Sequence, residues 1–397
     1  MLISSVWFEV IAAALLTTLI FATSYRPVWW FWSGASHRAS APAEVTDQDR
    51  RKFKTVSDVP GPYSLPIFGT RWIFSSIGSY TLNKIHDAYK DLNQRYGALC
   101  KEEALWNFPV ISVFSRQDIE AVIRRSPRYP LRPPQEVISH YRRNRHDRYT
   151  NLGLVNDIIS DIVETTIWEK KNDAKDESVE AVFQSILKQK SLDVRDKKAA
   201  IVDFIAAGIH TLGNTLVFLF DLIGRNPRVQ AKLYEESYSL APPGCDLTTE
   251  DLRKAKYLRA CITESFRMIP TTTCIARILD ESLELSGYRL PAGTVILLHT
   301  WIAGLSEDNF KDASEYLPER WLTPIAPHSP LLVAPFGAGR RICPGKRFVE
   351  LALQLILAKI IREFEIVVDE ELGLQFEFIL APESPVTLGF RDRSQKA

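Results

Sequence analysis

The chain contains 397 residues, of which 46% are hydrophobic and 24% are charged, as in an ordinary globular protein with a sizeable core. Its formal net charge is +1 at pH 7, so its overall charge gives no reason to expect nucleic acid as a partner. The five cysteines show no CxxC spacing, which argues against a disulfide framework or a zinc site and indicates a reducing compartment.

The N-terminal residues are predicted to be bound to a membrane. Residues 1–24 contain a single charged residue, Glu9, and are numerous enough to cross a bilayer as a helix. The aromatic run Trp29–Trp32 follows, as an interfacial belt would. Because no small-residue cleavage site is evident, we expect residues 1–24 to be an uncleaved transmembrane anchor and residues 25–58 to be a linker. The alternative is a buried hairpin of the fold.

Hydrophobic periodicity predicts helices and short strands in the rest of the chain. Apolar residues recur three and four positions apart over 82–96, which predicts a helix that ends at Gly97. Strand-like runs follow over 105–114, and Ser115 can cap the next helix. A long helix is expected from Asp193 to about Gly224, and Asn226-Pro227 begins another.

Short strands are expected at 274–279, 283–286 and 295–299, a last helix at 347–364, and a terminal hairpin over 376–390. The predicted fold class of residues 59–397 is therefore mainly α with small β-sheets.

The most informative stretch is Phe336–Gly345, which places Cys343 in a glycine-rich turn just before the last predicted helix. Glycines let the backbone fold closely around a sulfur, and turn N–H groups together with the helix dipole stabilise a negative charge there. These features suit a thiolate metal ligand. A lone cysteine is more often a buried structural thiol, so Cys343 taken alone does not decide between the two interpretations.

The loop FGAGRRICPG resembles the haem-binding loop of the cytochrome P-450 monooxygenases, whose FxxGxRxCxG pattern it contains in full. The resemblance implies haem b as the cofactor, with the Cys343 thiolate as axial ligand of the iron, where it favours O–O cleavage. It also implies that Arg341 binds a haem propionate, that Phe336 packs near the sulfur, and that Gly339 and Gly345 shape the loop around the cofactor.

A second motif of the family is an ExxR pair, here Glu264 and Arg267 in ITESFRMIP. Residues three apart share one helix face and can pair. In the family this pair joins the arginine of a PERW segment, which here is Arg320. The resemblance therefore implies a structural network of the three side chains. Without the resemblance, the ExxR pair would be interpreted as a solvated surface contact.

Residues 207–211, AGIHT, resemble the AGx(D/E)T motif in the family's helix across the distal face of the haem. The resemblance implies that Gly208 lets the backbone approach the cofactor and that Thr211 hydrogen-bonds bound oxygen. His210 stands where the family has an acid; a histidine can relay protons near neutral pH, or it can face outward without a role. From the residues alone, Gly208 can equally be a packing glycine, and Thr211 can bond to its own helix.

Two segments, 128–157 and 203–227, resemble insect ecdysteroid hydroxylases of the mitochondrial-type branch. This implies hydroxylation of a steroid, ecdysone to 20-hydroxyecdysone, with O2 as co-substrate; another sterol or a fatty acid is the alternative. Electrons would come from a ferredoxin or an NADPH-dependent reductase. Arg259 matches one basic position of the ferredoxin-binding helix, whereas the second falls on Thr263. The branch implies the mitochondrial inner membrane, and the N-terminal anchor implies the endoplasmic reticulum.

The chain departs from the family in its middle. Roughly a hundred residues are expected to be missing near 156–158, a large share of a domain of this size. They would include the helices that roof the substrate pocket and a WxxxR pair that binds a propionate. We therefore expect a P-450 fold lacking several central helices, in a splice or truncated form that is catalytically poor or inactive. A membrane-bound form that sequesters haem or a redox partner is the competing hypothesis.

Overall fold

The computed structural model describes residues 54–127, 130–133, 188, 190, 194–241, 244–323, 331–384 and 386–393. The expected anchor, nearly all of the expected linker and the expected deletion near 156–158 lie outside these residues. The chain divides into two units. One comprises Met1–Pro133, Phe218–Cys343 and Gln354–Ala397, and the other comprises Pro134–Val217 and Pro344–Leu353.

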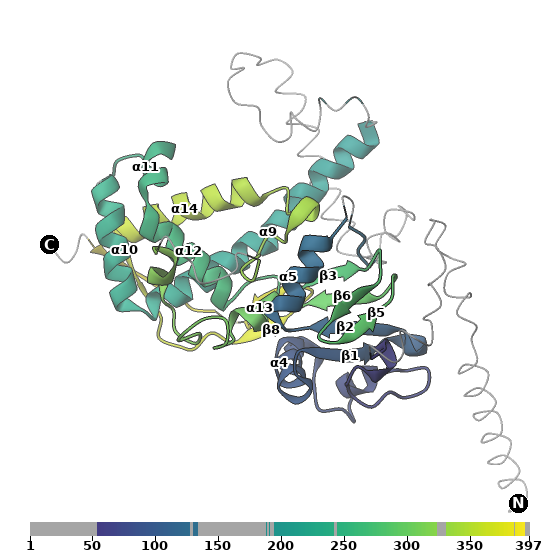
Figure 1. Ribbon diagram of the computed structural model, residues 1–397. Coiled ribbons are helices and arrows are strands. Elements are labelled where there is room, and N and C mark those ends of the chain that lie inside the picture. Colours follow the sequence, from purple (N-terminus) through teal and green to yellow (C-terminus); the bar gives the residue numbers. More distant parts are fainter. Residues whose placement is uncertain are drawn as a thin grey trace, which may run out of the picture. The chain divides into compact units, whose positions relative to one another are not determined.

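A four-stranded sheet lies in the first unit (Figure 1), in the order β1 (Leu99–Glu103), β2 (Pro109–Val113), β6 (Val295–Leu298) and β3 (Ile275–Ile278). Strand β2 runs parallel to β6, and the other two pairings are antiparallel. Side chains alternate between the faces of a strand. Leu99, Ile111 and Val113 therefore pack on one face with the apolar side of α5 (Arg116–Arg125), whereas Cys100 packs on the other face with α4 (Ile85–Tyr96).

The ends of these two helices agree with the sequence. Helix α4 stops at Gly97, whose φ of +81° lies in the left-handed region that glycine tolerates best. Ser115 precedes α5, and its hydroxyl accepts a hydrogen bond from the Asp118 N–H at 3.4 Å. Both boundaries were predicted and are confirmed.

The remaining helices of the first unit follow the same logic. Helix α10 (Pro227–Leu240) begins with a proline in its first turn, as expected from Asn226-Pro227. Helices α11 (Thr249–Lys254), α12 (Lys256–Met268) and α13 (Thr300–Gly304) follow it in the chain. Helices α9 (Val194–Gly224) and α14 (Lys346–Glu363) each contribute residues to both units. The predicted combination of helices with small sheets is confirmed.

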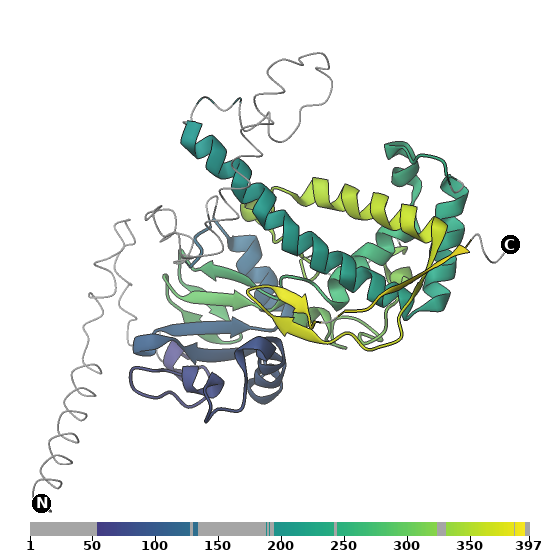
Figure 2. The ribbon, with the colours of Figure 1, turned by 180° about the vertical axis from the view of Figure 1, so that it is seen from behind.

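The C-terminal strands differ from the expected single hairpin over 376–390. Strand β8 (Leu374–Phe376) pairs with β9 (Leu380–Pro382), whereas β10 (Gly389–Asp392) pairs with β7 (Phe364–Val367), which follows α14 directly. These strands are the yellow arrows of Figure 2. Another two-stranded pair, β4 (Leu283–Leu285) and β5 (Tyr288–Leu290), turns at Gly287.

Strand β7 is bonded on its second edge by a side chain. The amide nitrogen Nε2 of Gln230, on α10, donates to the Ile366 carbonyl at 3.0 Å, and the Ile366 N–H donates to Oε1 of Gln230 at 2.7 Å. Gln230 is 5% exposed, so these bonds are made inside the protein. The glutamine amide thus takes the place of a peptide group from a neighbouring strand.

A buried polar network joins strands β1 and β2 to His299, the residue that follows β6. Ser112 donates to Glu102 at 2.8 Å, and Nε2 of His299 lies 3.0 Å from the Ser112 hydroxyl oxygen. The His299 ring stacks on Phe114 with 4.7 Å between ring centroids. Burial raises the pKa of the Glu102 carboxyl and lowers the pKa of His299 to about 3. Both groups therefore favour their neutral forms.

Among the described residues, one helical segment, Ala200–Gly224 of α9, is long and apolar enough to cross a membrane, with a mean hydropathy of 1.5. Core helices of soluble proteins share this length and composition. The segment coincides with the long central helix expected from the sequence.

Candidate functional site

The cysteine loop is closed by its own backbone. The Cys343 N–H donates to the Phe336 carbonyl at 2.8 Å, and the Ile342 N–H donates to the Gly339 carbonyl at 3.1 Å. Gly337 and Gly339 have φ values of +74° and +69°, in the left-handed region that a side chain disfavours. The thiol of Cys343 is free and half-buried. The glycines of the motif therefore form the tight turn that presents the sulfur.

Arg277, a residue that the sequence did not single out, lies beside this loop. It is on β3 and only 4% exposed, and its Nη2 donates to the Ala338 carbonyl at 3.3 Å. Its Nη1 donates to the Ala276 carbonyl at 2.8 Å, while its buried Nε has no hydrogen-bond partner among the described residues. The one feature of the sequence that could have indicated Arg277 is its place within a short apolar strand, because a buried charge needs a partner.

Other arginines surround Arg277. Burial lowers the pKa of the Arg277 guanidinium, and the charges of Arg132 and Arg341 lower it further. Arg341, the expected propionate ligand, is exposed, and its Nε donates to the Pro130 carbonyl at 3.3 Å. A cluster of three cations, one of them a buried guanidinium with an unused N–H, suits a ligand that carries carboxylates. The residues present therefore fit the two propionates of haem.

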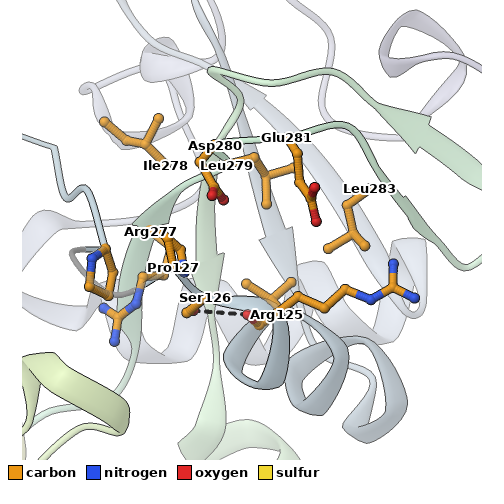
Figure 3. A pocket seen from close by; sticks show the side chains of 11 residues that line it. Arg125, Ser126, Pro127, Arg277, Ile278, Leu279, Asp280, Glu281 and Leu283 are labelled. Carbon is orange, nitrogen blue, oxygen red and sulfur yellow. Dashed lines mark hydrogen bonds between the residues drawn. The ribbon is translucent and has the colours of Figure 1, made fainter. Parts of the chain in front are cut away.

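Arg277 also lines a small pocket, which Figure 3 shows, together with Arg125 at the end of α5. Asp280 and Glu281 line it from the segment after β3, but neither forms a hydrogen bond with Arg277 in the described structure. This pocket therefore does not supply the missing partner of the Arg277 Nε.

The ExxR pair is a buried ion pair. Nη2 of Arg267 lies 2.8 Å from Oε1 of Glu264, and Nε of Arg267 donates to Oε2 at 3.0 Å. Both side chains are 0% exposed. Nε of Arg320, in the 3-10 turn η5 (Pro318–Trp321), donates to Oε1 of Glu264 at 2.9 Å. The structure thus brings together the three residues that the motifs singled out, and a solvated surface contact is excluded.

Backbone groups complete this network. Nη1 of Arg267 donates to the carbonyls of Gly304 at 2.9 Å and Ala313 at 2.7 Å. Arg320 reaches the Lys311 carbonyl at 2.9 Å. The network therefore ties α12 and α13 to the segment that leads into η5, all within the first unit.

The residues of the AGIHT motif lie on α9, in the second unit. The Thr211 hydroxyl donates to the carbonyls of Ala207 at 2.6 Å and Gly208 at 3.4 Å, so it bonds to its own helix. His210 is exposed. A Cβ added to Gly208 would meet no atom within 4 Å, so no described neighbour requires a glycine there. Gly345, also in this unit, is buried and accepts a hydrogen bond from the Val349 N–H at 2.9 Å.

Comparison with known proteins agrees with these motifs. Residues 150–390 match the family model described as Cytochrome P-450. Ecdysone 20-monooxygenase of Drosophila melanogaster is 30% identical over an alignment of 488 residues, which covers 87% of this chain and 90% of that protein.

Two further relatives are mitochondrial. The 1,25-dihydroxyvitamin D(3) 24-hydroxylase of Rattus norvegicus is 37% identical over 210 residues, covering 52% of this chain and 41% of the relative. The mitochondrial cytochrome P-450 302a1 of Drosophila melanogaster is 33% identical over 220 residues, covering 54% and 45% of the two chains.

Proposed function

The chain belongs to the cytochrome P-450 family of haem-dependent monooxygenases, and from this premise we propose that Cys343 is the thiolate ligand of its haem iron. The observation that carries the proposal is the closed glycine turn around a free, half-buried thiol, with the Cys343 N–H bonded to the Phe336 carbonyl at 2.8 Å. Haem supplies the activation of dioxygen from which one oxygen atom is inserted into the substrate.

The residues around the loop would bind and orient the cofactor. We assign Arg341 and Arg277 to the propionates, because the buried Nε of Arg277 has no partner among the described residues. A bidentate contact from such a guanidinium to a carboxylate is stronger than a neutral hydrogen bond. Phe336 would pack near the sulfur, and Gly339 and Gly345 would give the loop its curvature.

On α9, Gly208 would let the backbone approach the cofactor. Thr211 would exchange its bond to the Ala207 carbonyl for one to the oxygen, a switch that a threonine hydroxyl can make by rotating about χ1. His210 would relay a proton in place of the family's acid.

The proposed substrate is a steroid, with ecdysone as the first compound to test. A relative whose alignment covers 87% of this chain is named for ecdysone, and another is named for a dihydroxyvitamin D. At 30% identity a pocket can differ in shape, so a different sterol or a fatty acid is the second candidate.

The proposed electron donor is a ferredoxin, because several relatives are mitochondrial; an NADPH-dependent reductase is the alternative. Arg259 is the one residue that matches a basic position of the family's ferredoxin-binding helix. Its Nη1 donates to the carbonyls of Leu252 at 2.7 Å and Arg253 at 2.8 Å. The proposed location is the mitochondrial inner membrane, with the endoplasmic reticulum as the alternative that the expected N-terminal anchor favours.

We further propose that the chain lacks an internal segment near 156–158 and is catalytically poor. The alignment with the ecdysone relative runs over 488 residues, more than the 397 of this chain. Helices missing from a P-450 domain would leave the substrate pocket open to water, which promotes side reactions in place of controlled oxygen chemistry.

One experiment tests these proposals together. The full chain is purified, its haem content is measured, and the carbon monoxide difference spectrum of the reduced protein is compared between wild type, Cys343→Ser and the matched exposed-thiol control Cys245→Ser. A thiolate-type Soret band that only Cys343→Ser removes supports the assignment, and a band that survives in Cys343→Ser refutes it. Titration with ecdysone against lauric acid then separates the substrate classes, and ordinary ecdysone turnover would overturn the inactivity proposal.

A further inference from the structure

Two aromatic rings connect helix α12 to the cysteine loop. Phe266 lies on α12, directly before Arg267, and is 8% exposed. Its ring centroid is 5.3 Å from that of Phe336, the first residue of the loop motif, with an angle of 72° between the ring planes. This edge-to-face geometry is among the favoured arrangements of two aromatic rings.

Phe336 is held at two points. Its ring packs against Phe266, and its backbone carbonyl accepts the N–H of Cys343 at 2.8 Å. The side chain and the carbonyl of one residue cannot move independently over more than a small range, because a few covalent bonds join them. A shift of the Phe336 ring therefore moves the acceptor that closes the turn around Cys343.

Phe266 is itself fixed by its neighbour in the chain. The Arg267 guanidinium binds Glu264 and donates to the carbonyls of Gly304 and Ala313, so this turn of α12 is tied to two other segments. A phenylalanine has only two side-chain torsions, and in a packed helix they are restricted further. Phe266 therefore offers Phe336 a rigid surface.

We infer that Phe266 is a positioning residue for the Cys343 thiol, acting through Phe336. The inference rests on the proposed function of Cys343 as the haem ligand, and it adds a role for a residue outside the loop motif. A thiolate ligand must be presented in one orientation, and a loop with two glycines in the left-handed region has little stiffness of its own. The aromatic pair supplies that stiffness before any cofactor binds.

The competing explanation is that Phe266 only fills the core. Phe310 provides the comparison, since it is 0% exposed and its ring lies 5.3 Å from the guanidinium carbon of Arg267 and 6.1 Å from the Trp321 ring. It thus packs against the same network without a ring contact to Phe336 in the described structure. If Phe266 only fills the core, Phe266→Leu and Phe310→Leu should change the reactivity of the Cys343 thiol equally.

The test measures the thiol directly and needs no haem. The rate at which iodoacetamide alkylates Cys343 is determined by peptide mass spectrometry in the full, haem-free chain, with the exposed Cys245 as the reference in the same sample. Wild type is compared with Phe266→Leu, Phe336→Leu, the double variant and Phe310→Leu, all in native buffer. Urea unfolding of each variant records its stability separately.

Phe266→Leu is expected to raise the Cys343 rate by about 2- to 13-fold, the factor that corresponds to the strength of one aromatic pair. Phe336→Leu should raise the Cys343 rate by a similar factor. The rate in the double variant should be close to that of either single variant, because both substitutions remove the same contact. Phe310→Leu should lower the urea midpoint and leave the Cys343 rate unchanged.

Three results would overturn the inference: a Cys343 rate in Phe266→Leu within the scatter of wild type, an equal increase in Phe310→Leu, or a double variant in which the increases from Phe266→Leu and Phe336→Leu simply multiply. Failure of the proposed function looks different. In that case haem added to the wild-type chain leaves Cys343 as reactive as before, while the outcome of the variant comparison still decides the role of Phe266.

Discussion

The indole N–H of Trp321 donates a hydrogen bond to Oε2 of Glu264 at 2.8 Å, across 57 positions of the chain. The same carboxylate accepts bonds from Arg267, from Arg320 and from the Leu317 N–H. A single buried anion is thus surrounded by donors from two separate segments, and this saturation is what makes its burial tolerable.

Removing that anion should unfold the first unit. Glu264→Ala leaves two buried guanidinium groups without a counter-ion, which costs about 3–5 kcal/mol of unfolding free energy. We expect aggregated or insoluble protein at normal growth temperature. The control is Glu250→Ala on α11, where the pair with Arg253 is solvent-exposed and worth about 0–1 kcal/mol. Soluble Glu264→Ala at the yield of Glu250→Ala would contradict the prediction.

A milder change tests the Trp321 bond alone. Trp321→Phe keeps a ring near Phe310 but removes the donor to Glu264, so the free energy of unfolding should fall by about 1.5–3 kcal/mol, the value of a hydrogen bond to a charged group. Urea denaturation followed by circular dichroism measures it. A midpoint equal to that of wild type would show that the remaining donors compensate fully.

Arg277→Met should act in opposite directions on the protein with and without haem. In the haem-free chain it removes a buried charge that has no carboxylate partner among the described residues, so the urea midpoint should stay the same or rise. With haem, the loss of a charge-assisted bond should speed haem transfer to apomyoglobin by roughly 10- to 100-fold. Arg277→Lys keeps the charge without the planar fork, so its rate of haem transfer should fall between those of wild type and Arg277→Met. A lower midpoint with unchanged haem transfer would assign Arg277 a structural role only.

His299 should make the stability of the protein depend on pH. In the unfolded chain its imidazole takes up a proton near the ordinary pKa of about 6.5, whereas burial in the fold lowers the pKa to about 3. Between these values the unfolded state binds more protons, so the His299 contribution to unfolding free energy is lost as pH falls, by up to about 1.4 kcal/mol per unit.

The variant His299→Gln, which can still donate to Ser112, removes this dependence. Urea unfolding at pH 4.5, 5.5 and 6.5 should show a wild-type slope steeper than that of the variant, and the two slopes should agree above pH 7.5. Burial of Glu102 acts with the opposite sign, since a raised carboxyl pKa stabilises the fold at low pH, but Glu102 is present in both proteins. Parallel slopes from pH 4.5 to 6.5 would contradict the prediction.

Features that rest on local sequence were predictable, and those that rest on distant partners were not. The ends of α4 at Gly97 and the cap of α5 at Ser115 follow from backbone freedom and a short side chain. Strand β1 was missed because Lys101, Glu102 and Glu103 look like surface residues. Glu102 can be buried because Ser112, on the partner strand, and Tyr89, on α4, donate hydrogen bonds to its carboxyl group.

The same division holds for the candidate site. The cysteine loop and the Glu264–Arg267–Arg320 set could be located from motifs, and the structure adds how the latter three meet. Arg277 could not be located, because what distinguishes it is an unpaired atom beside Ala338, which is 61 positions away. The pairing of β7 with β10 was also missed, since the intervening β8–β9 pair hides the relationship in the sequence.

The bonds between Gln230 and Ile366 also bear on how copies of this chain behave toward one another. A two-stranded sheet has open edges, and an open edge is a template on which another chain can add a strand and begin to aggregate. On β7 the N–H and carbonyl of Ile366 are already taken by the glutamine. Gln230→Leu would fill the same space but leave both buried groups without a partner, so the edge would be closed to another chain only while α10 stays packed over it.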